Sequence, residues 1–243
     1  YNNLSNGQHT FDFEAKDDAG NITAYSSNYI WTVNTQGPTN LSITSGPAGP
    51  TNDNTPTFTV SATGATQYRY STNNGQTYGT WGASNSYTTG LNDGGYTFIF
   101  QAQDAAGNIS TGPSQAFTVD TQPPTALSIT SGVPSATNDN TPTFTVTATG
   151  ATQYRYSTNN GSTYGTWGTS NTYTTGLNDG NYTFIFQAMD AAENISTGPS
   201  QAFQIDTAAP TSLSITSGPS EGSTTSNASA NFTVSATDSH GPV

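Results

Sequence analysis

The sequence has no cysteine, one methionine and only three basic residues, Lys16, Arg69 and Arg155. Without cysteine the chain can form neither disulfides nor thiolate metal sites. Three basic side chains cannot neutralise a run of phosphates, so nucleic acid is excluded as an expected partner. Only 7% of the residues are charged, and the net charge is -12. Thr, Ser, Asn, Gln and Gly therefore supply the polar surface.

Lysine and glutamate are nearly absent, while Thr, Tyr and Phe are abundant. This balance argues against helices and for strands. No apolar run is long enough for a membrane span or a signal peptide. An acidic, cysteine-free chain rich in Thr and Asn is typical of a bacterial cell-surface or secreted protein. We therefore expect an extracellular location at the cell surface.

The chain repeats itself over the length of a whole domain. Residues 51–121 return as residues 137–207, 86 positions later, with only nine differences. Residues 4–39 match the second half of this unit, and residues 210–215 and 232–237 match parts of its start. An array of this kind multiplies length or binding surface instead of building one active site. We expect a longer parent polypeptide, two full domains and two partial ones, with boundaries at 1–37, 38–122, 123–208 and 209–243.

Apolar and polar residues alternate through the first full unit. Phe58 and Val60 share one face of a segment, and Phe98 and Phe100 share one face of another. Such alternation is typical of half-buried strands, and turn signals such as 74–75 separate the segments. About seven short strands without helical periodicity are the signature of a β-sandwich. The sequence therefore predicts an all-β fold, a tandem array of seven-stranded antiparallel β-sandwich domains.

Two kinds of aromatic residue have predicted structural roles in each domain. Tyr96 follows Leu91 and Gly94 with the spacing of a tyrosine corner, in which the Tyr hydroxyl donates to nearby backbone. Trp81 and Trp167 are expected to fill the core between the two sheets.

Several motifs resemble a known family. The run from Leu91 to Ser110, the opening Thr51 to Val60, and the closing Val119 to Thr121 are similar to bacterial Ig-like repeats of large surface adhesins and biofilm-associated proteins. The resemblance covers nearly the whole chain and implies an immunoglobulin- or fibronectin-III-like fold. It also implies a structural spacer role in an adhesin or appendage, with calcium bound at domain junctions.

Every aspartate of the full units lies in a turn or linker. Ig-like topology puts the first turn and the turn before the penultimate strand at one end, and the final hairpin turn at the other. We therefore expect three acids of one domain to approach Asp190 of the next and to bind calcium, which takes about six to eight oxygen ligands. The alternative is that each aspartate hydrogen-bonds its own turn. The candidate calcium ligands are Asp53, Asp93, Asp104, Asp120, Asp139, Asp179, Asp190 and Asp206.

Some positions depart from this acidic pattern. The first linker has Asn34 where the next has Asp120, and 226–228 lacks the acid of the first turn. Glu193 stands where the first full unit has Gly107. If that turn needs a left-handed residue, glutamate costs about 1 kcal/mol there. Either the second turn differs, or Glu193 gains an interaction such as a junction cation.

Catalysis has few candidate residues, and we expect no enzyme activity. Both full units lack His, Lys and Cys, while His9 and His240 lie in the partial units and are expected to be exposed polar residues. A rival function is carbohydrate binding, as an accessory module of a secreted enzyme, although core packing also explains most of the rings. The aromatic residues that could stack on sugars are Tyr78, Trp81, Tyr87, Tyr164, Trp167 and Tyr173.

Self-assembly is a further alternative to the spacer role. Near-identical, weakly charged sandwiches could pack with neighbouring copies into a homo-oligomer, filament, sheath or surface layer. The two partial domains carry late and early strands, so two chains could complete one sandwich by strand complementation. A spacer is expected to be monomeric and rod-like at any concentration, whereas a filament subunit is expected to assemble.

Overall fold

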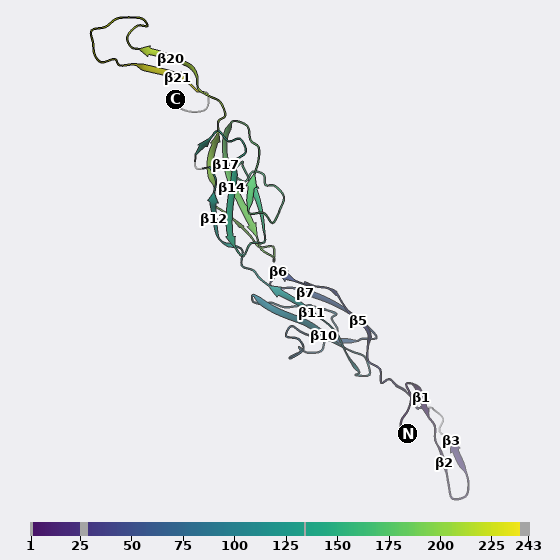
Figure 1. Cartoon of the computed structure of the whole chain (residues 1–243). Helices are drawn as coiled ribbons and strands as arrows, with labels where there is room; N and C mark the ends of the chain where they lie inside the picture. Colours follow the sequence, from purple (N-terminus) through teal and green to yellow (C-terminus); the bar gives the residue numbers. More distant parts are fainter. Residues whose placement is uncertain (1, 25–28, 134, 239–243) are drawn as a thin grey trace. The chain divides into compact units, whose positions relative to one another are not determined.

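The computed structural model describes residues 2–24, 29–133 and 135–238. These residues form strands, turns and loops, and they divide into two compact units, Tyr1–Asp120 and Thr121–Val243 (Figure 1). The part of the chain that is described holds no helix that could span a membrane. The strands of the first unit are β1 (Gly7–Phe11), β2 (Glu14–Lys16), β3 (Ile22–Ala24), β4 (Tyr29–Val33), β5 (Thr39–Ser45), β6 (Pro50–Thr51), β7 (Thr57–Thr63), β8 (Gln67–Ser71), β9 (Ser86–Thr88), β10 (Gly94–Gln103) and β11 (Ile109–Val119).

The second unit repeats the order of β5 to β11 and adds a final pair of strands. Its last full strand is split in two, because residues 198–200 leave the ladder that their counterparts in β11 keep. The strands are β12 (Thr125–Ser131), β13 (Ala136–Thr137), β14 (Thr143–Thr149), β15 (Gln153–Ser157), β16 (Thr172–Thr174), β17 (Gly180–Met189), β18 (Ile195–Thr197), β19 (Gln201–Ile205), β20 (Thr211–Ser217) and β21 (Thr233–Thr237).

Each full repeat is a sandwich of two sheets. In the first repeat β5, β7 and β9 form one sheet in that order, and β6, β11, β10 and β8 form the other. All of these pairs are antiparallel except β6 with β11. The second repeat has sheets β12-β14-β16 and β13-β19-β17-β15, with β18 also pairing with β17. The predicted all-β, Ig-like sandwich array is confirmed.

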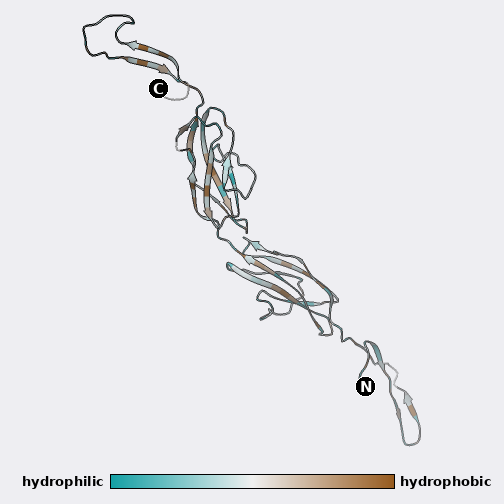
Figure 2. Cartoon of the chain, in the orientation of Figure 1, coloured by the Kyte–Doolittle hydropathy of each residue, from teal (hydrophilic) through white to brown (hydrophobic). Residues whose placement is uncertain are grey.

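Phenylalanine rings from the two sheets meet in the core. Phe58 of β7 stacks on Phe98 of β10 with ring centroids 4.0 Å apart and planes 5° apart, and both rings are fully buried. Phe144 and Phe184 form the same pair in the second repeat at 4.1 Å. Figure 2 shows the alternation of apolar and polar residues along these strands. Each repeat has a hydrophobic core of its own, and the two cores have no residue in common.

The prediction that Trp81 and Trp167 fill the core was wrong. Trp81 is only half-buried and is absent from the core cluster. The segment after the 74–75 turn forms no strand, and Trp81 packs instead on the Arg69 guanidinium. Along β8, Arg69 alternates with the core-facing Tyr68 and Tyr70, so the indole that packs on it lies on the outer face of the four-stranded sheet.

A tyrosine corner closes one end of each sandwich, as predicted. The Tyr96 hydroxyl donates to the Asn92 carbonyl at 2.9 Å, and Tyr182 makes the same bond to Asn178 at 2.9 Å. This bond pins the turn that leads into β10 or β17.

The first strand of each repeat is an irregular edge strand. The pairing of β5 with β7 shifts register twice, between Thr39 and Ser42 and between Ile43 and Ser45. Asn40 within β5 has a left-handed φ of 52°, and Ala126 in β12 has the same value. Bulges of this kind twist an edge strand away from a regular ladder.

The partial domains expose residues that the full repeats bury. The first partial domain pairs β1 with β4 and β2 with β3, and the last pairs β20 with β21. Phe232 is 58% exposed, whereas its counterpart Phe58 is fully buried. The apolar faces of both partial domains are therefore without the second sheet that covers them in a full repeat.

Candidate functional site

Three acid-bearing segments meet at one end of the first repeat. The Leu91 amide donates to the Asn54 carbonyl at 2.8 Å, which joins the first turn to the turn before β10. The end of β11 is bonded to β6, because the Asp120 amide donates to the Thr51 carbonyl at 3.0 Å. These joined segments carry Asp53, Asp93 and Asp120.

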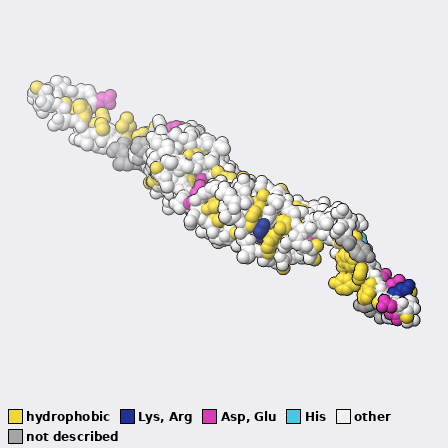
Figure 3. Space-filling model, turned by 90° about the horizontal axis from the view of Figure 1, so that it is seen from below, with side chains coloured by type: hydrophobic (Ala, Val, Ile, Leu, Met, Phe, Trp, Pro, Cys, Tyr) yellow, Lys and Arg dark blue, Asp and Glu magenta, His cyan; other side chains and the backbone are white. Residues whose placement is uncertain are grey.

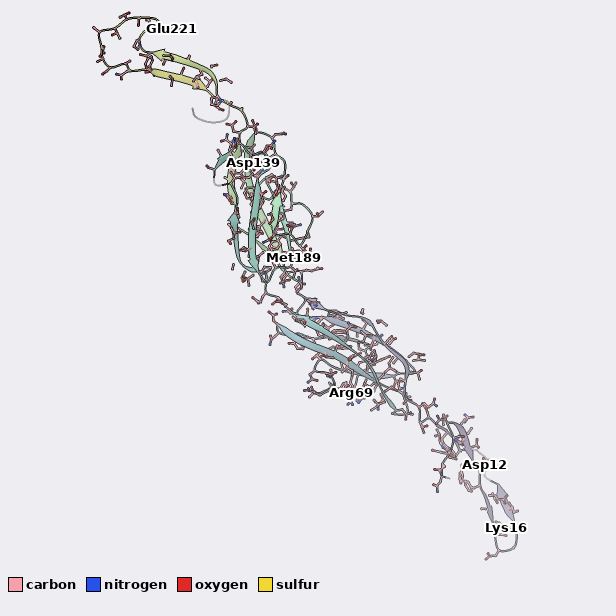
Figure 4. All side chains as sticks on the ribbon, viewed as in Figure 1. Asp12, Lys16, Arg69, Asp139, Met189 and Glu221 are labelled. Carbon is pink, nitrogen blue, oxygen red and sulfur yellow. The ribbon has the colours of Figure 1, made fainter. Side chains whose placement is uncertain are left out.

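The remaining aspartate of each repeat lies at the opposite end, after β10 or β17. Asp104 directly follows β10, whose other end begins at Gly94. In the second repeat Asp139 lies at one end and Met189, the neighbour of Asp190, lies at the other (Figure 4). The backbone arrangement of the acids within each repeat is therefore the one that the Ig-like topology predicts.

The aspartates of the first turn hydrogen-bond their own turn. Asp53 Oδ1 accepts the Thr55 amide at 2.8 Å and the Thr55 hydroxyl at 3.0 Å. Asp139 Oδ1 accepts the same two groups of Thr141, at 2.8 and 2.9 Å. These bonds are what the turn-forming alternative requires of the two carboxylates.

Asp104 organises the turn after β10. Its Oδ1 accepts the amides of Ala106 and Asn108 at 2.9 Å each, and its Oδ2 accepts the Asn108 side-chain amide at 3.0 Å. Asp190 repeats this arrangement with Asn194. The hydrogen bond from the Asn108 side chain is the main cause that holds the pKa of Asp104 below its usual value, and backbone amides add to it against the effect of desolvation.

The linkers are bonded to the domain that they leave. Asp179 Oδ1, in the turn before β17, accepts the Thr207 amide at 3.1 Å and its hydroxyl at 2.8 Å. Asn6 Oδ1 accepts the same two groups of Thr35, at 3.0 and 2.8 Å. One side-chain oxygen therefore fixes the first linker residue to the end of its own domain.

The first linker is also bonded to the domain that it enters. The Asn34 side-chain amide donates to Asp104 Oδ2 at 2.8 Å. The Asn108 side-chain amide donates in turn to the carbonyls of Asn34 at 2.9 Å and Gln36 at 3.3 Å. In the second unit the Ser196 hydroxyl donates to the linker carbonyl of Pro124 at 2.7 Å. Specific side chains therefore hold the linker backbone.

The predicted calcium sites require several ligands that lie close together. Across the described ranges, no three side chains of the His, Cys, Asp or Glu type lie close enough together to hold a metal ion. Asp120 and Asp190 belong to different units, and their approach stays a prediction.

Glu193 occupies a left-handed position. Its φ is 69°, and φ of Gly107 at the same place in the first repeat is 87°. In both copies the amide of this residue donates to the preceding aspartate carbonyl, at 3.4 Å from Glu193 and 3.2 Å from Gly107. The two turns are the same, so the first of the two alternatives for Glu193 is wrong.

A cation lies between two aromatic rings on the outer face of each four-stranded sheet. The Arg69 Cζ atom is 4.9 Å from the ring centroid of Tyr78 and 4.6 Å from that of Trp81. Its Nε and Nη2 donate to Gln101 Oε1 at 2.8 and 2.6 Å. Figure 3 shows a basic side chain with hydrophobic side chains on both sides, and Figure 4 labels Arg69. The second repeat has the same cluster, formed by Arg155, Tyr164, Trp167 and Gln187.

The rings that were predicted to stack on sugars already pack against other side chains of this protein. Tyr78 and Trp81 each have a guanidinium against one face. Tyr87 stacks on Tyr70 with centroids 4.9 Å apart and packs against the core. The second repeat has the same contacts, so none of the six rings is a bare platform.

His9 is half-buried, where the sequence suggested an exposed residue. Its Nε2 donates to the Ser5 carbonyl at 2.8 Å, and its ring lies 5.7 Å from that of Trp31. His240 lies outside the described residues. The one histidine that the structure describes therefore has structural contacts.

Known proteins share this architecture. Residues 40–121 and 126–207 each match the model of the bacterial Ig-like domain. A curated relative, chitinase A1 of Niallia circulans, is 38% identical over 126 residues, which cover 48% of this chain and 18% of that protein. The chain therefore spans less than a fifth of this relative.

Solved structures of similar modules include the fibronectin(III)-like modules of Clostridium thermocellum CbhA, with a TM-score of 0.49 and 15% identity over 68% of this chain and 93% of that one. The chicken CNTN1 FN1–FN3 domains give a TM-score of 0.44 and 10% identity over 82% of this chain and 75% of that one. The family match covers most of the chain by itself. With two tandem copies of the domain, the chain belongs to the bacterial Ig-like domain family.

Proposed function

We propose that this chain is a non-catalytic spacer of an extracellular bacterial surface protein, such as an adhesin or an appendage. A spacer needs domains that fold separately and connections that resist bending. The two separate phenylalanine cores meet the first need. The linker bonds support the second, and they are the observation that carries the proposal.

The reactive side chains support a structural role. The guanidinium groups of both repeats bind a glutamine amide and two rings. Asp53, Asp104, Asp139 and Asp190 accept hydrogen bonds from their own turns. General acid–base catalysis needs a titratable group free to reach substrate, and these groups are bound to their own domain.

The spacer role can be tested on the two full repeats, residues 38–208. Light scattering after size exclusion is expected to give a monomer at every concentration, and small-angle scattering an extended particle. Stretching one molecule is expected to give two unfolding events of similar force. A compact or concentration-dependent particle would contradict the spacer role.

Calcium at the junctions is a separate proposal. Asp120 takes the place of Asn34 in the second linker, and a carboxylate cannot donate the hydrogen bond that Asn34 makes. A hard cation would satisfy carboxylate and carbonyl oxygens there. Calcium is expected to raise the melting temperature of the chain, and Asp120→Asn should remove this shift. The control is Asn34→Asp, which changes the first linker instead of the second. If the original chain has the same melting temperature with and without chelator, this proposal is wrong.

Self-assembly by strand complementation is the second candidate. Leu213 is 80% exposed and Ile215 66% exposed, whereas Leu41 and Ile43 at the same positions pack against the first core. Phe11 and Phe13 of the other partial domain are 38% and 51% exposed. A second copy could cover these faces by strand complementation. Association of the whole chain, but not of residues 38–208, would support this route.

A role as an accessory module of a secreted enzyme is the third candidate. Its support is the similarity of 126 residues to part of a chitinase. Because the candidate rings already pack against other side chains, stacking on a flat polysaccharide surface gives the accessory-module role little support. A pull-down of the chain on insoluble chitin is the direct test.

A further inference from the structure

Both repeats have a groove at the same place on the outer face of the four-stranded sheet. The groove of the second repeat has a volume of about 730 Å³, and that of the first about 560 Å³. Its floor consists of neighbouring stretches of β17 and β19, where Asn181, Thr183, Ala202 and Gln204 alternate with inward-facing aromatic residues. Ligand sites typically have about 300–1,000 Å³, so the size suits a small ligand or part of a polymer.

The loop after β15 forms one wall, and hydrogen bonds hold it in place. The Ser157 hydroxyl donates to Asn159 Oδ1 at 2.7 Å, and the Asn159 side-chain amide donates to the Thr163 hydroxyl at 2.8 Å. The Asn160 backbone amide donates to the Thr183 carbonyl at 3.1 Å, which ties the loop to the floor. The Arg155 cluster fixes the end of the same loop. The groove therefore exists before any ligand binds, which lowers the cost of binding.

The lining favours a neutral, polyhydroxylated ligand. Among the described residues, those that line the groove are hydroxyl and amide residues with two alanines, a tyrosine and a phenylalanine, and none is charged. Amides and hydroxyls offer both donors and acceptors, which match the hydroxyl groups of a sugar. An ionic ligand would bring a charge that nothing in the lining pairs. The net charge of -12 also repels polyanions.

A sheet face suits a sugar better than a peptide strand. Peptides that add to a sheet pair with a free strand edge. At the floor, Thr183 of β17 is bonded to residues 158–160 of the loop on one side, and β19 pairs on the other, so the floor presents side chains instead of an open edge. The geometry therefore favours recognition by side-chain hydrogen bonds.

The two repeats differ at this groove more than elsewhere. Three of the nine differences between residues 51–121 and 137–207 fall on its lining positions, and two of these lie on the floor. At the floor the second repeat has Asn181 for Gly95 and Gln204 for Thr118. Both changes add a side-chain amide to the floor of the second groove.

We propose that the groove of the second repeat binds a neutral oligosaccharide. The amides of Asn181 and Gln204 and the hydroxyls of Thr158 and Thr183 supply the polar contacts. The site goes beyond the spacer role and does not depend on it, because a spacer could carry such a site or lack one.

The test is a titration of the ¹⁵N-labelled whole chain with neutral hexasaccharides of glucose, mannose, galactose and N-acetylglucosamine. At least one is expected to shift the side-chain amide signals of Asn181 and Gln204 in an NMR spectrum. The double variant Asn181→Gly with Gln204→Thr restores the residues of the first repeat and is expected to weaken binding about tenfold. Absence of groove shifts up to about 10 mM of every saccharide would overturn the proposal.

The reverse variant keeps the test valid if the first variant folds poorly. Gly95→Asn with Thr118→Gln should give the first repeat a second site, and a Cβ at Gly95 would meet no atom within 4 Å. Equal binding by all variants would place the site elsewhere and overturn the proposal. A polar hexapeptide of Ser, Gly and Asn is the competing ligand; groove shifts with the peptide alone would also overturn it. Unfolding temperatures of all variants serve as the control for folding.

Discussion

A single glutamate marks the turn after β17. Glu193 has a φ of 69°, in the left-handed region that favours glycine, and its counterpart is Gly107. Glu193→Gly is expected to stabilise the chain by about 1 kcal/mol, because glycine adopts this conformation without steric cost. Urea unfolding measures the change. The mirror variant Gly107→Glu should destabilise by a similar amount, and an effect of the opposite sign in either would show that Glu193 has a compensating contact.

Two half-buried tyrosines are expected to make stability depend on high pH. Burial raises the pKa of Tyr70 to about 12, with a further contribution from Tyr68, and Tyr156 behaves alike. The unfolded chain ionises these groups near pH 10, about the ordinary tyrosine value. The stabilisation is therefore complete below pH 10 and is lost as the pH rises from 10 to 12.

The measurement is urea unfolding between pH 9 and 12. The double variant Tyr70→Phe with Tyr156→Phe should lose stability less steeply with pH than the original chain. Tyr29→Phe removes an exposed tyrosine and is the control. Parallel slopes for the original chain and the double variant would contradict the effect of burial.

For single residues, the sequence predicted which residues lie in turns better than it predicted the distant residues that they contact. Asp53 and Asp104 lie in turns because Asp favours turns through local hydrogen bonds. The bond between Asp179 and Thr207 joins residues 28 positions apart and depends on how the sheet closes. A signal was available, since Thr follows the acid or amide in each linker, as in 34–35, 120–121 and 206–207.

Among the elements, the loop after β8 depends on the stacked cation. Trp81→Ala is expected to cost about 1–2 kcal/mol, the range for a partly buried cation–π contact. Phe98→Ala, in the core, should cost about 3–5 kcal/mol. Urea unfolding of the two variants measures the difference, with Ser114→Ala, at an exposed position of β11, as the control. Equal costs would mean that Trp81 packs like a core residue.

The sequence predicted the strands but not the positions of the tryptophans, because the strands show an alternation of apolar and polar residues and the tryptophan segments do not. Alternation along β7 and β10 reports burial directly, because side chains of a strand point to opposite faces. Trp81 lies in a segment without alternation, so only its size suggested the core. Its true place depends on Arg69 of another element, which local sequence does not reveal.

For the whole molecule, self-similarity predicted the domain array. A unit that returns after 86 residues must fold in the same way each time. The groove could not be predicted in this way, because its floor and wall come from three separate segments that only the folded sheet brings together.

Each full repeat is expected to fold without its neighbours. Residues 38–122 expressed alone should unfold in one cooperative transition, because every residue of the first core lies within this range. Residues 123–208 are the matched comparison. Calorimetry measures both transitions, and a non-cooperative or absent transition in either would show that the domains need each other to fold.

The pairing of hydroxyl groups across the strands has a consequence for the environments that the protein can tolerate. Ser42 meets Ser61 at 2.8 Å and Thr57 meets Thr88 at 2.8 Å, while the guanidinium of Arg69 binds an amide instead of a carboxylate. Dissolved ions weaken attractions between opposite charges, but they have little effect on bonds between neutral groups. The folded repeats should therefore be about equally stable in fresh water and in brine.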